Sequence, residues 1–188
     1  MFNSKKFVAM KRLGIALMMV FGVAVCFASC GSNEDKMIME CAKLYVGTNS
    51  LFHEKWSQTV MQAQKDGTMD DSDLEEATEA VGMAMEFFIS SAVNYCYRDG
   101  EVTESGIYRA MTDFLDDDDT TMLLNIFGVF SLKELAKMIY SNYAAMPKSI
   151  KLTKAEGNNK YPDYYSETHD VRISVISGAV LVRPYSGM

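Results

Sequence analysis

Apolar residues between positions 37 and 146 recur at intervals of three and four, which is the spacing of one face of an α-helix. Proline is absent from residues 31 to 146, and strong helix formers are frequent there. Short polar segments divide this pattern, so the sequence predicts several helices. They cover about residues 35–46, 51–65, 72–97, 104–115, 121–127 and 131–145.

Short motifs mark several of these helix ends. The segment Gly47-Thr48-Asn49-Ser50 is expected to end the first helix and to cap the second. Ser72 and Glu75 have the spacing of a capping box, in which side chains bind the free backbone N–H groups at a helix start. The same spacing occurs at Ser131 and Glu134. Six helices with short connections predict an antiparallel, bundle-like domain.

The helical spacing ends at Pro147, and β-branched residues become frequent near the C-terminus. Apolar and polar residues alternate over Val171 to Val175, and Ser177-Gly178 is a turn signal that predicts a β-hairpin. Residues 150–152 are a candidate third strand. Because an isolated hairpin is only marginally stable in water, we expect it to pack on the helices. The predicted fold is therefore mainly α, a six-helix bundle-like domain with a small C-terminal β-hairpin appendage.

The N-terminal segment is basic and then apolar. Four basic residues precede the 16 apolar residues from Leu13 to Ala28, and the first 30 residues contain no acid. This is the arrangement of a secretory signal peptide, since a membrane-spanning helix needs about 20 apolar residues. Both Met1 and Met10 are suitable translation starts.

The end of this segment, Phe27-Ala28-Ser29-Cys30, resembles the lipobox of bacterial lipoproteins, although Phe27 replaces the usual aliphatic residue. The resemblance covers the signal segment alone. It implies that Cys30 carries a lipid and that the chain is anchored in the cell envelope of a Gram-negative bacterium. No aspartate follows Cys30, so we expect an outer-membrane lipoprotein that faces the periplasm or the cell surface.

The sequence thus predicts one folded domain behind a processed leader. The expected parts are a signal peptide (1–29), a lipidated polar tether (30–36), a helical domain (37–147), and a C-terminal loop and hairpin packed on it (148–188).

Removal of the leader makes the chain more acidic. It leaves 14 basic and 25 acidic residues, a formal charge of −11 compared with −7 for the whole chain. A surface of this charge repels the phosphate backbone of nucleic acids. The expected partners are therefore the membrane, through the lipid, and another envelope protein.

Cys41 and Cys96 are the two cysteines left after processing and lipidation. They could form one disulfide, worth about 4 kcal/mol for a loop of this length, or remain buried free thiols. An oxidising compartment favours the disulfide. The two histidines, His53 and His169, and the absence of a CxxC motif argue against zinc, and we expect no cofactor.

Two further groups are candidate binding sites. Asp116, Asp117, Asp118 and Asp119 could bind calcium at about millimolar concentration, or form a solvated start to the next helix, which we favour. Tyr161, Tyr164 and Tyr165 could form a flat binding surface or cover the edge of the core.

These features favour a non-catalytic protein-interaction module, such as an assembly factor, an accessory protein or an immunity-type inhibitor. The C-terminal hairpin and the tyrosine loop are the expected contact face. The alternative is a small hydrolase or glycan-binding accessory protein that uses a carboxylate cleft. The sequence contains no recognisable nucleophile or phosphate-binding motif and offers no candidate catalytic residue.

Overall fold

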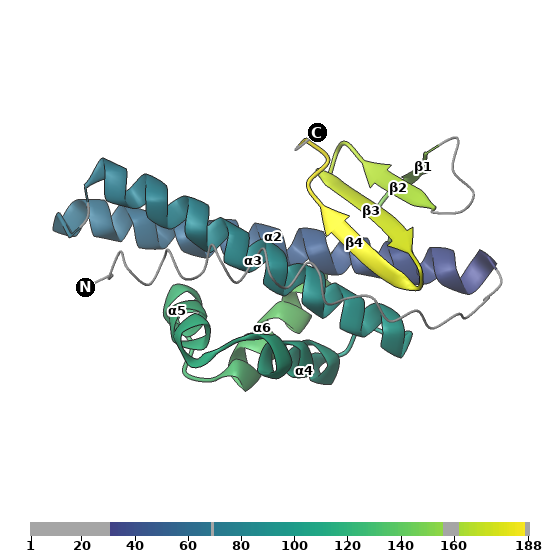
Figure 1. Ribbon diagram of the computed structural model, residues 1–188, viewed down its shortest axis with the longest axis horizontal. Helices are drawn as coiled ribbons and strands as arrows, with labels where there is room; N and C mark the ends of the chain where they lie inside the picture. Colours follow the sequence, from purple (N-terminus) through teal and green to yellow (C-terminus); the bar gives the residue numbers. More distant parts are fainter. Residues whose placement is uncertain (1–30, 69, 156–161, 187–188) are drawn as a thin grey trace.

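The computed structural model describes residues 31–68, 70–155 and 162–186, and its main feature is a long antiparallel helical hairpin (Figure 1). The 36 residues of the first helix extend over about 54 Å at about 1.5 Å per residue. The hairpin consists of α2 (Gly31–Asp66) and α3 (Asp71–Asp99).

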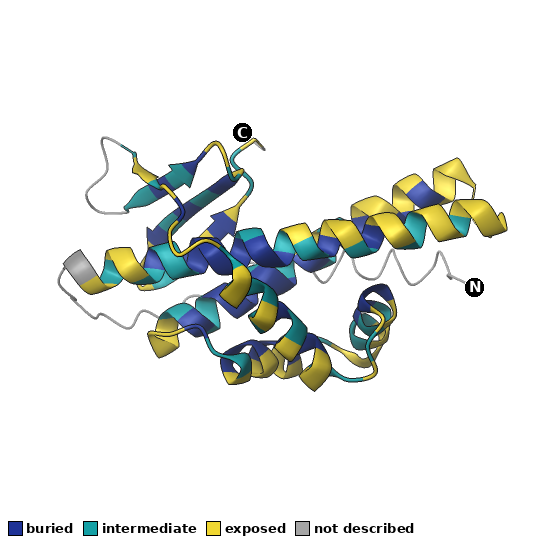
Figure 2. Cartoon of the chain, turned by 180° about the vertical axis from the view of Figure 1, so that it is seen from behind, coloured by how far each residue is buried: buried dark blue, intermediate teal, exposed yellow. Residues whose placement is uncertain are grey.

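Two smaller layers pack on opposite sides of this hairpin (Figure 1). The end of the hairpin where α2 leads into α3 extends beyond both layers, and most of its residues are exposed (Figure 2). One layer consists of α4 (Glu104–Phe114), α5 (Asp117–Phe127) and α6 (Leu132–Ala145). The other is an antiparallel sheet of β1 (Thr153–Lys154), β2 (Asp163–Ser166), β3 (Val171–Ile176) and β4 (Ala179–Arg183), in that spatial order.

The hydrophobic core lies where the three layers meet. The sheet contributes alternate residues of β3 and β4 to it, because successive side chains of a strand point to opposite faces. The core therefore joins the C-terminal strands to the helices. Its members include Ile38, Leu44, Tyr45, Phe88, Ile89, Met111, Leu123, Leu135, Ile139, Val171, Ile173 and Val182.

The first two predicted helices are a single helix, so the six predicted helices are five in the described part of the chain. Gly47 is buried within α2, and its carbonyl oxygen accepts a hydrogen bond of 2.5 Å from Nδ2 of Asn142 on α6. A Cβ at position 47 would lie 3.2 Å from Cγ of Met146. The glycine therefore allows α6 to approach α2 closely, and this contact offsets its weak preference for a helix.

The segment predicted as a polar tether is helical as well, since α2 begins at Gly31. Its acidic side chains contact the rest of the protein. Tyr97 donates a hydrogen bond to Glu34 at 3.3 Å, and Tyr164 donates one to Asp35 at 2.9 Å. The start of α2 is therefore attached both to α3 and to the sheet.

Of the two predicted capping boxes, one sets the start of its helix as expected and the other does not. Ser131 Oγ accepts a hydrogen bond from the backbone N–H of Glu134 at 3.2 Å, which confirms the predicted start of α6. The start of α3 differs, because Asp70 rather than Ser72 is its cap and accepts from two backbone N–H groups.

The C-terminal region is a four-stranded sheet instead of the predicted hairpin. Ser177 and Gly178 both have positive φ angles, 52° and 80°, and form the predicted two-residue turn between β3 and β4. Residues 163–166, expected to be loop, form β2. The strand expected at residues 150–152 lies directly after them, at residues 153–154, and is β1.

Candidate binding surfaces

The two described tyrosines of the candidate surface, Tyr164 and Tyr165, lie on opposite faces of the sheet. Tyr161 lies outside the described residues. Tyr164 faces the helices and is only 8% exposed, and its burial and its hydrogen bond to Asp35 raise its pKa to about 12. Tyr165 points to the opposite face, where its ring stacks on Tyr185 with centroids 5.3 Å apart. The sequence alone could not pair Tyr185 with Tyr165, because this contact depends on how the chain turns back after β4.

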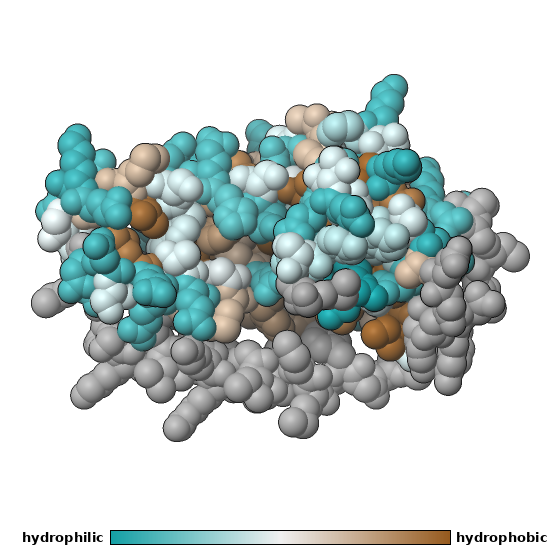
Figure 3. Space-filling view, turned by 90° about the horizontal axis from the view of Figure 1, so that it is seen from above, coloured by the Kyte–Doolittle hydropathy of each residue, from teal (hydrophilic) through white to brown (hydrophobic). Residues whose placement is uncertain are grey.

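The outer face of the sheet combines polar and apolar side chains. Asp163 and Arg172 form a cross-strand ion pair, in which Arg172 Nε lies 2.9 and 3.1 Å from the two carboxylate oxygens. Ser174 Oγ donates to the same carboxylate at 3.0 Å. Burial opposes ionisation of Asp163, but these hydrogen bonds hold its pKa below the usual value. Leu181, which pairs with Ser174, is 46% exposed. Viewed from the side of the sheet, the molecule is mostly hydrophilic with small apolar patches (Figure 3).

The acid run Asp116 to Asp119 forms a helix start. Asp116 is the cap of α5 and accepts from the backbone N–H of Asp119 at 2.8 Å, and the other three residues form the first turn. Burial, followed by the charges of Asp116 and Asp118, raises the pKa of Asp119. Within the described residues, no three His, Cys, Asp or Glu side chains are grouped to hold a metal ion. The run therefore serves α5 through its cap and its charge, as the favoured alternative of a helix start expects.

Cys41 and Cys96 are free thiols, so the structure contains no disulfide between them. Both are completely buried, on α2 and α3 respectively. Burial raises the pKa of both thiols, that of Cys96 to about 11, and the nearby Cys96 raises the pKa of Cys41 further. The two residues contribute to the core as small apolar side chains.

The two histidines lie in different surroundings. His53 is exposed on α2, next to the ring of Phe52. His169 Nδ1 lies 3.1 Å from Ser166 Oγ, but Ser166 is only 5% exposed. Asp170 accepts hydrogen bonds from Ser186 and is not the partner of His169 in the described contacts. A nucleophilic serine needs an accessible hydroxyl and an oriented base, so this pair stabilises the turn between β2 and β3.

A charged cluster that the sequence did not suggest joins α2 to α6. Lys43 Nζ lies 3.0 Å from Glu40 and 4.8 Å from the centre of the Tyr143 ring. The Tyr143 hydroxyl donates to the same glutamate. Burial and this hydrogen bond raise the pKa of Tyr143. Every charge in the cluster is partnered, so its role is to connect the two helices.

Comparison with known proteins does not assign the chain to a family. No protein-family model, curated protein or solved structure matches it. Among the helices that the structure describes, none is both long and apolar enough to cross a membrane. The function is therefore argued from the geometry of the chain.

Proposed function

We propose that the protein is a lipid-anchored envelope protein of a Gram-negative bacterium that acts by binding another envelope protein. The attachment of the start of α2 is the observation that carries this proposal. The helix begins at the residue after Cys30, and Glu34 and Asp35 bind the body of the protein through tyrosine hydroxyls. A lipid on Cys30 would therefore hold the whole domain close to the bilayer in a restricted orientation.

This anchoring would place the two ends of the hairpin in different surroundings. The start of α2 would lie near the lipid, and the end of the hairpin would project up to about 54 Å from it if α2 stands upright. A rigid domain that displays an exposed end away from the membrane is suited to contacting another protein.

The outer face of the sheet is the first candidate contact face. It carries the stacked Tyr165 and Tyr185 together with the exposed Leu181, a combination of rigid aromatic and apolar area. The alternative of a hydrolase or glycan-binding protein has no specific observation in its favour. The serine of the Ser166–His169 pair is buried, and the acid run forms a helix start.

The first experiment tests the anchor and the interaction together in native membranes. We expect the mass of the mature protein to show a lipid on Cys30, and in-cell cross-linking to give a protein adduct. The Cys30→Ser variant should lose both the lipid and membrane attachment. Cys26→Ser is the matched control, because this cysteine leaves with the signal peptide. An unmodified Cys30, or the absence of any protein adduct, would overturn the proposal.

Cross-linking also tests the sheet face. Deletion of β3 and β4 would disrupt the fold, because Val171, Ile173 and Val182 belong to the core. A Leu181→Lys substitution changes the outer face alone, and we expect it to reduce the adduct if this face makes the contact. An unchanged adduct would exclude the sheet face and leave the interaction itself intact.

A further inference from the structure

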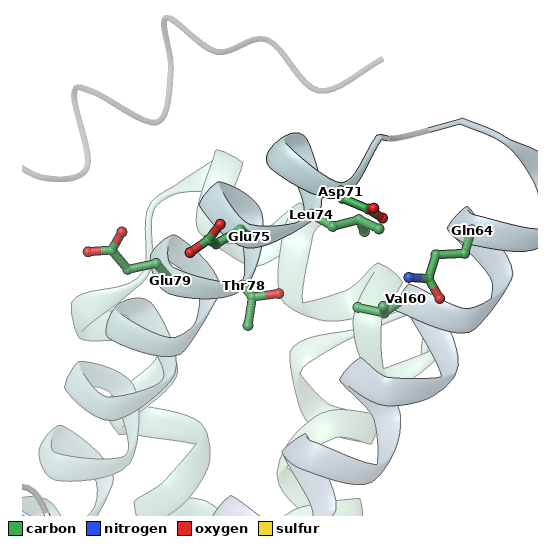
Figure 4. A pocket seen from close by; sticks show the side chains of 7 residues that line it. All are labelled: Val60, Gln64, Asp71, Leu74, Glu75, Thr78 and Glu79. Atoms are coloured by element: carbon green, nitrogen blue, oxygen red, sulfur yellow. The ribbon is translucent and has the colours of Figure 1, made fainter.

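The exposed end of the hairpin contains a mainly apolar groove between α2 and α3, with a volume of about 470 Å³ (Figure 4). Leu74 and Thr78 point from α3 toward Val60 on α2 and line its floor (Figure 4). The groove also has an acidic side, formed by Asp71, Glu75 and Glu79 of α3.

The floor of the groove is held in place by a contact between the two helices. Trp56 Nε1 on α2 donates a hydrogen bond of 3.1 Å to Thr78 Oγ1 on α3. The side chains of Trp56 and Leu74 are buried, with 7% and 6% of each residue exposed. A partner would therefore meet a formed groove and would not need to separate the helices.

The charge around the groove is strongly negative. Residues 60–80 contain seven acidic residues and one lysine, Lys65. Asp71, Glu75 and Glu79 recur every four residues and so follow one another along one side of α3. No described residue forms an ion pair with any of the three. Like charges at this spacing repel one another and destabilise a helix. Positively charged side chains of a partner, placed beside this row, would offset that repulsion.

We propose that this groove binds a cationic amphipathic helix of a protein partner. Its apolar side chains would enter the groove, and its lysine or arginine side chains would face the acidic row. The row from Asp71 to Glu79 is about 12 Å long, which matches about two turns of a partner helix with apolar residues three and four apart. A divalent cation is a poorer occupant, because the described residues contain no metal-binding group of three such side chains.

This inference rests on the proposed function and adds the position and chemistry of the contact. Charge complementarity of this kind acts mainly on the rate of association and on the choice of partner. The groove lies at the opposite end of α2 from Cys30, so the proposed anchor would leave it accessible to a partner in solution or on a facing surface.

The probe for the test is a fluorescent 14-residue peptide designed as an amphipathic helix of leucine and lysine. Its binding to the lipidated protein in nonionic detergent is measured by anisotropy, with empty micelles subtracted. A leucine–glutamate peptide of the same pattern is the peptide control. We expect the lysine peptide to bind and the glutamate peptide not to bind.

Two double variants with the same change in charge locate the site. Glu75→Lys with Glu79→Lys should weaken binding of the lysine peptide by at least about tenfold, because two favourable charge contacts become repulsive. Glu101→Lys with Glu167→Lys should weaken it by less than about threefold, because these exposed residues lie outside α2 and the groove and alter only the overall electrostatic potential of the protein. Circular dichroism checks that all four substitutions, each at an exposed residue, leave the helices intact.

Equal weakening by the two double variants would show that the peptide senses net charge alone and would overturn the proposal. Binding of neither peptide would overturn it as well. These outcomes are separate from the cross-linking result. A cross-linked partner that is unaffected by Glu75→Lys with Glu79→Lys would reject the groove and leave the interaction function in place.

Discussion

Asn94 on α3 pairs with the main chain of Val180 as a neighbouring strand would. Its Nδ2 donates to the Val180 carbonyl at 2.7 Å, and its Oδ1 accepts from the Val180 N–H at 2.8 Å. Ser90 adds a hydrogen bond to the carbonyl of Val182 at 3.3 Å. Since β4 is the last strand of the sheet, these side chains cover an edge that could otherwise pair with another chain.

Replacement of Asn94 by Ala should therefore destabilise the fold. It leaves the N–H and C=O groups of Val180 without these partners, which typically costs about 1–3 kcal/mol for each buried group left unsatisfied. Urea unfolding measures the change. Asn125→Ala removes an exposed side chain on α5 and is the matched control. A cost no larger than that of the control would show that the sheet edge does not depend on α3.

Two helical glycines should respond to substitution in opposite directions. Gly47→Leu places a large side chain against Asn142 and Met146, and overpacking of this kind typically costs about 1–3 kcal/mol. Gly82→Ala meets no atom within 4 Å and should stabilise α3 by about 0.5–1 kcal/mol, because alanine favours a helix. Thermal unfolding compares the two variants with the wild type. A Gly47→Leu variant as stable as the wild type would contradict the close contact between α2 and α6.

The buried thiols should react slowly in the folded protein. Alkylating reagents attack the thiolate, and the pKa of Cys96 is raised to about 11, so little thiolate is present at neutral pH. We expect labelling of Cys41 and Cys96 to be more than about a hundredfold slower than in denaturant, because burial limits access as well. Mass spectrometry follows the label. Thiols that remain unlabelled in denaturant until a reductant is added would indicate the disulfide predicted from the sequence.

Stability should fall in acid partly through the pair of Asp163 and Arg172. The pKa of Asp163 is lower in the folded protein than in the unfolded chain, so its contribution is present above the unfolded value near 3.9 and is lost as the pH falls through the folded value. Asp163→Asn should cost about 1.5–3 kcal/mol at pH 7, as expected for hydrogen bonds to a charged group.

The difference between the wild type and Asp163→Asn should begin to narrow below about pH 4, where the unfolded wild-type chain takes up a proton, and should vanish only below the lowered pKa of folded Asp163, where both side chains are neutral. Glu101→Gln is a control that removes a carboxylate from an exposed position. Urea unfolding at pH 7, 5 and 3 measures these differences. A difference between wild type and Asp163→Asn that stays constant with pH would exclude ionisation of Asp163 as its source.

Candidate sites could be predicted from the sequence where neighbouring residues determine their structure, but not where tertiary packing does. The acid run was correctly favoured as a helix start, since a cap needs only the residues next to it. The tyrosines could not be assigned in the same way. Treating residues 163–166 as loop hid the fact that Tyr164 and Tyr165 alternate between the two faces of β2.

The sequence by itself determined a mainly helical chain, the capping box at Ser131 and Glu134, and the turn at Ser177-Gly178. These features follow from residues within a few positions of one another, whose backbone preferences and hydrogen bonds act wherever the segment lies. Only the tertiary structure decided that α2 continues through Gly47 and that a groove forms between Val60 and Leu74. Both depend on side chains from distant parts of the chain, and their packing outweighs local preference.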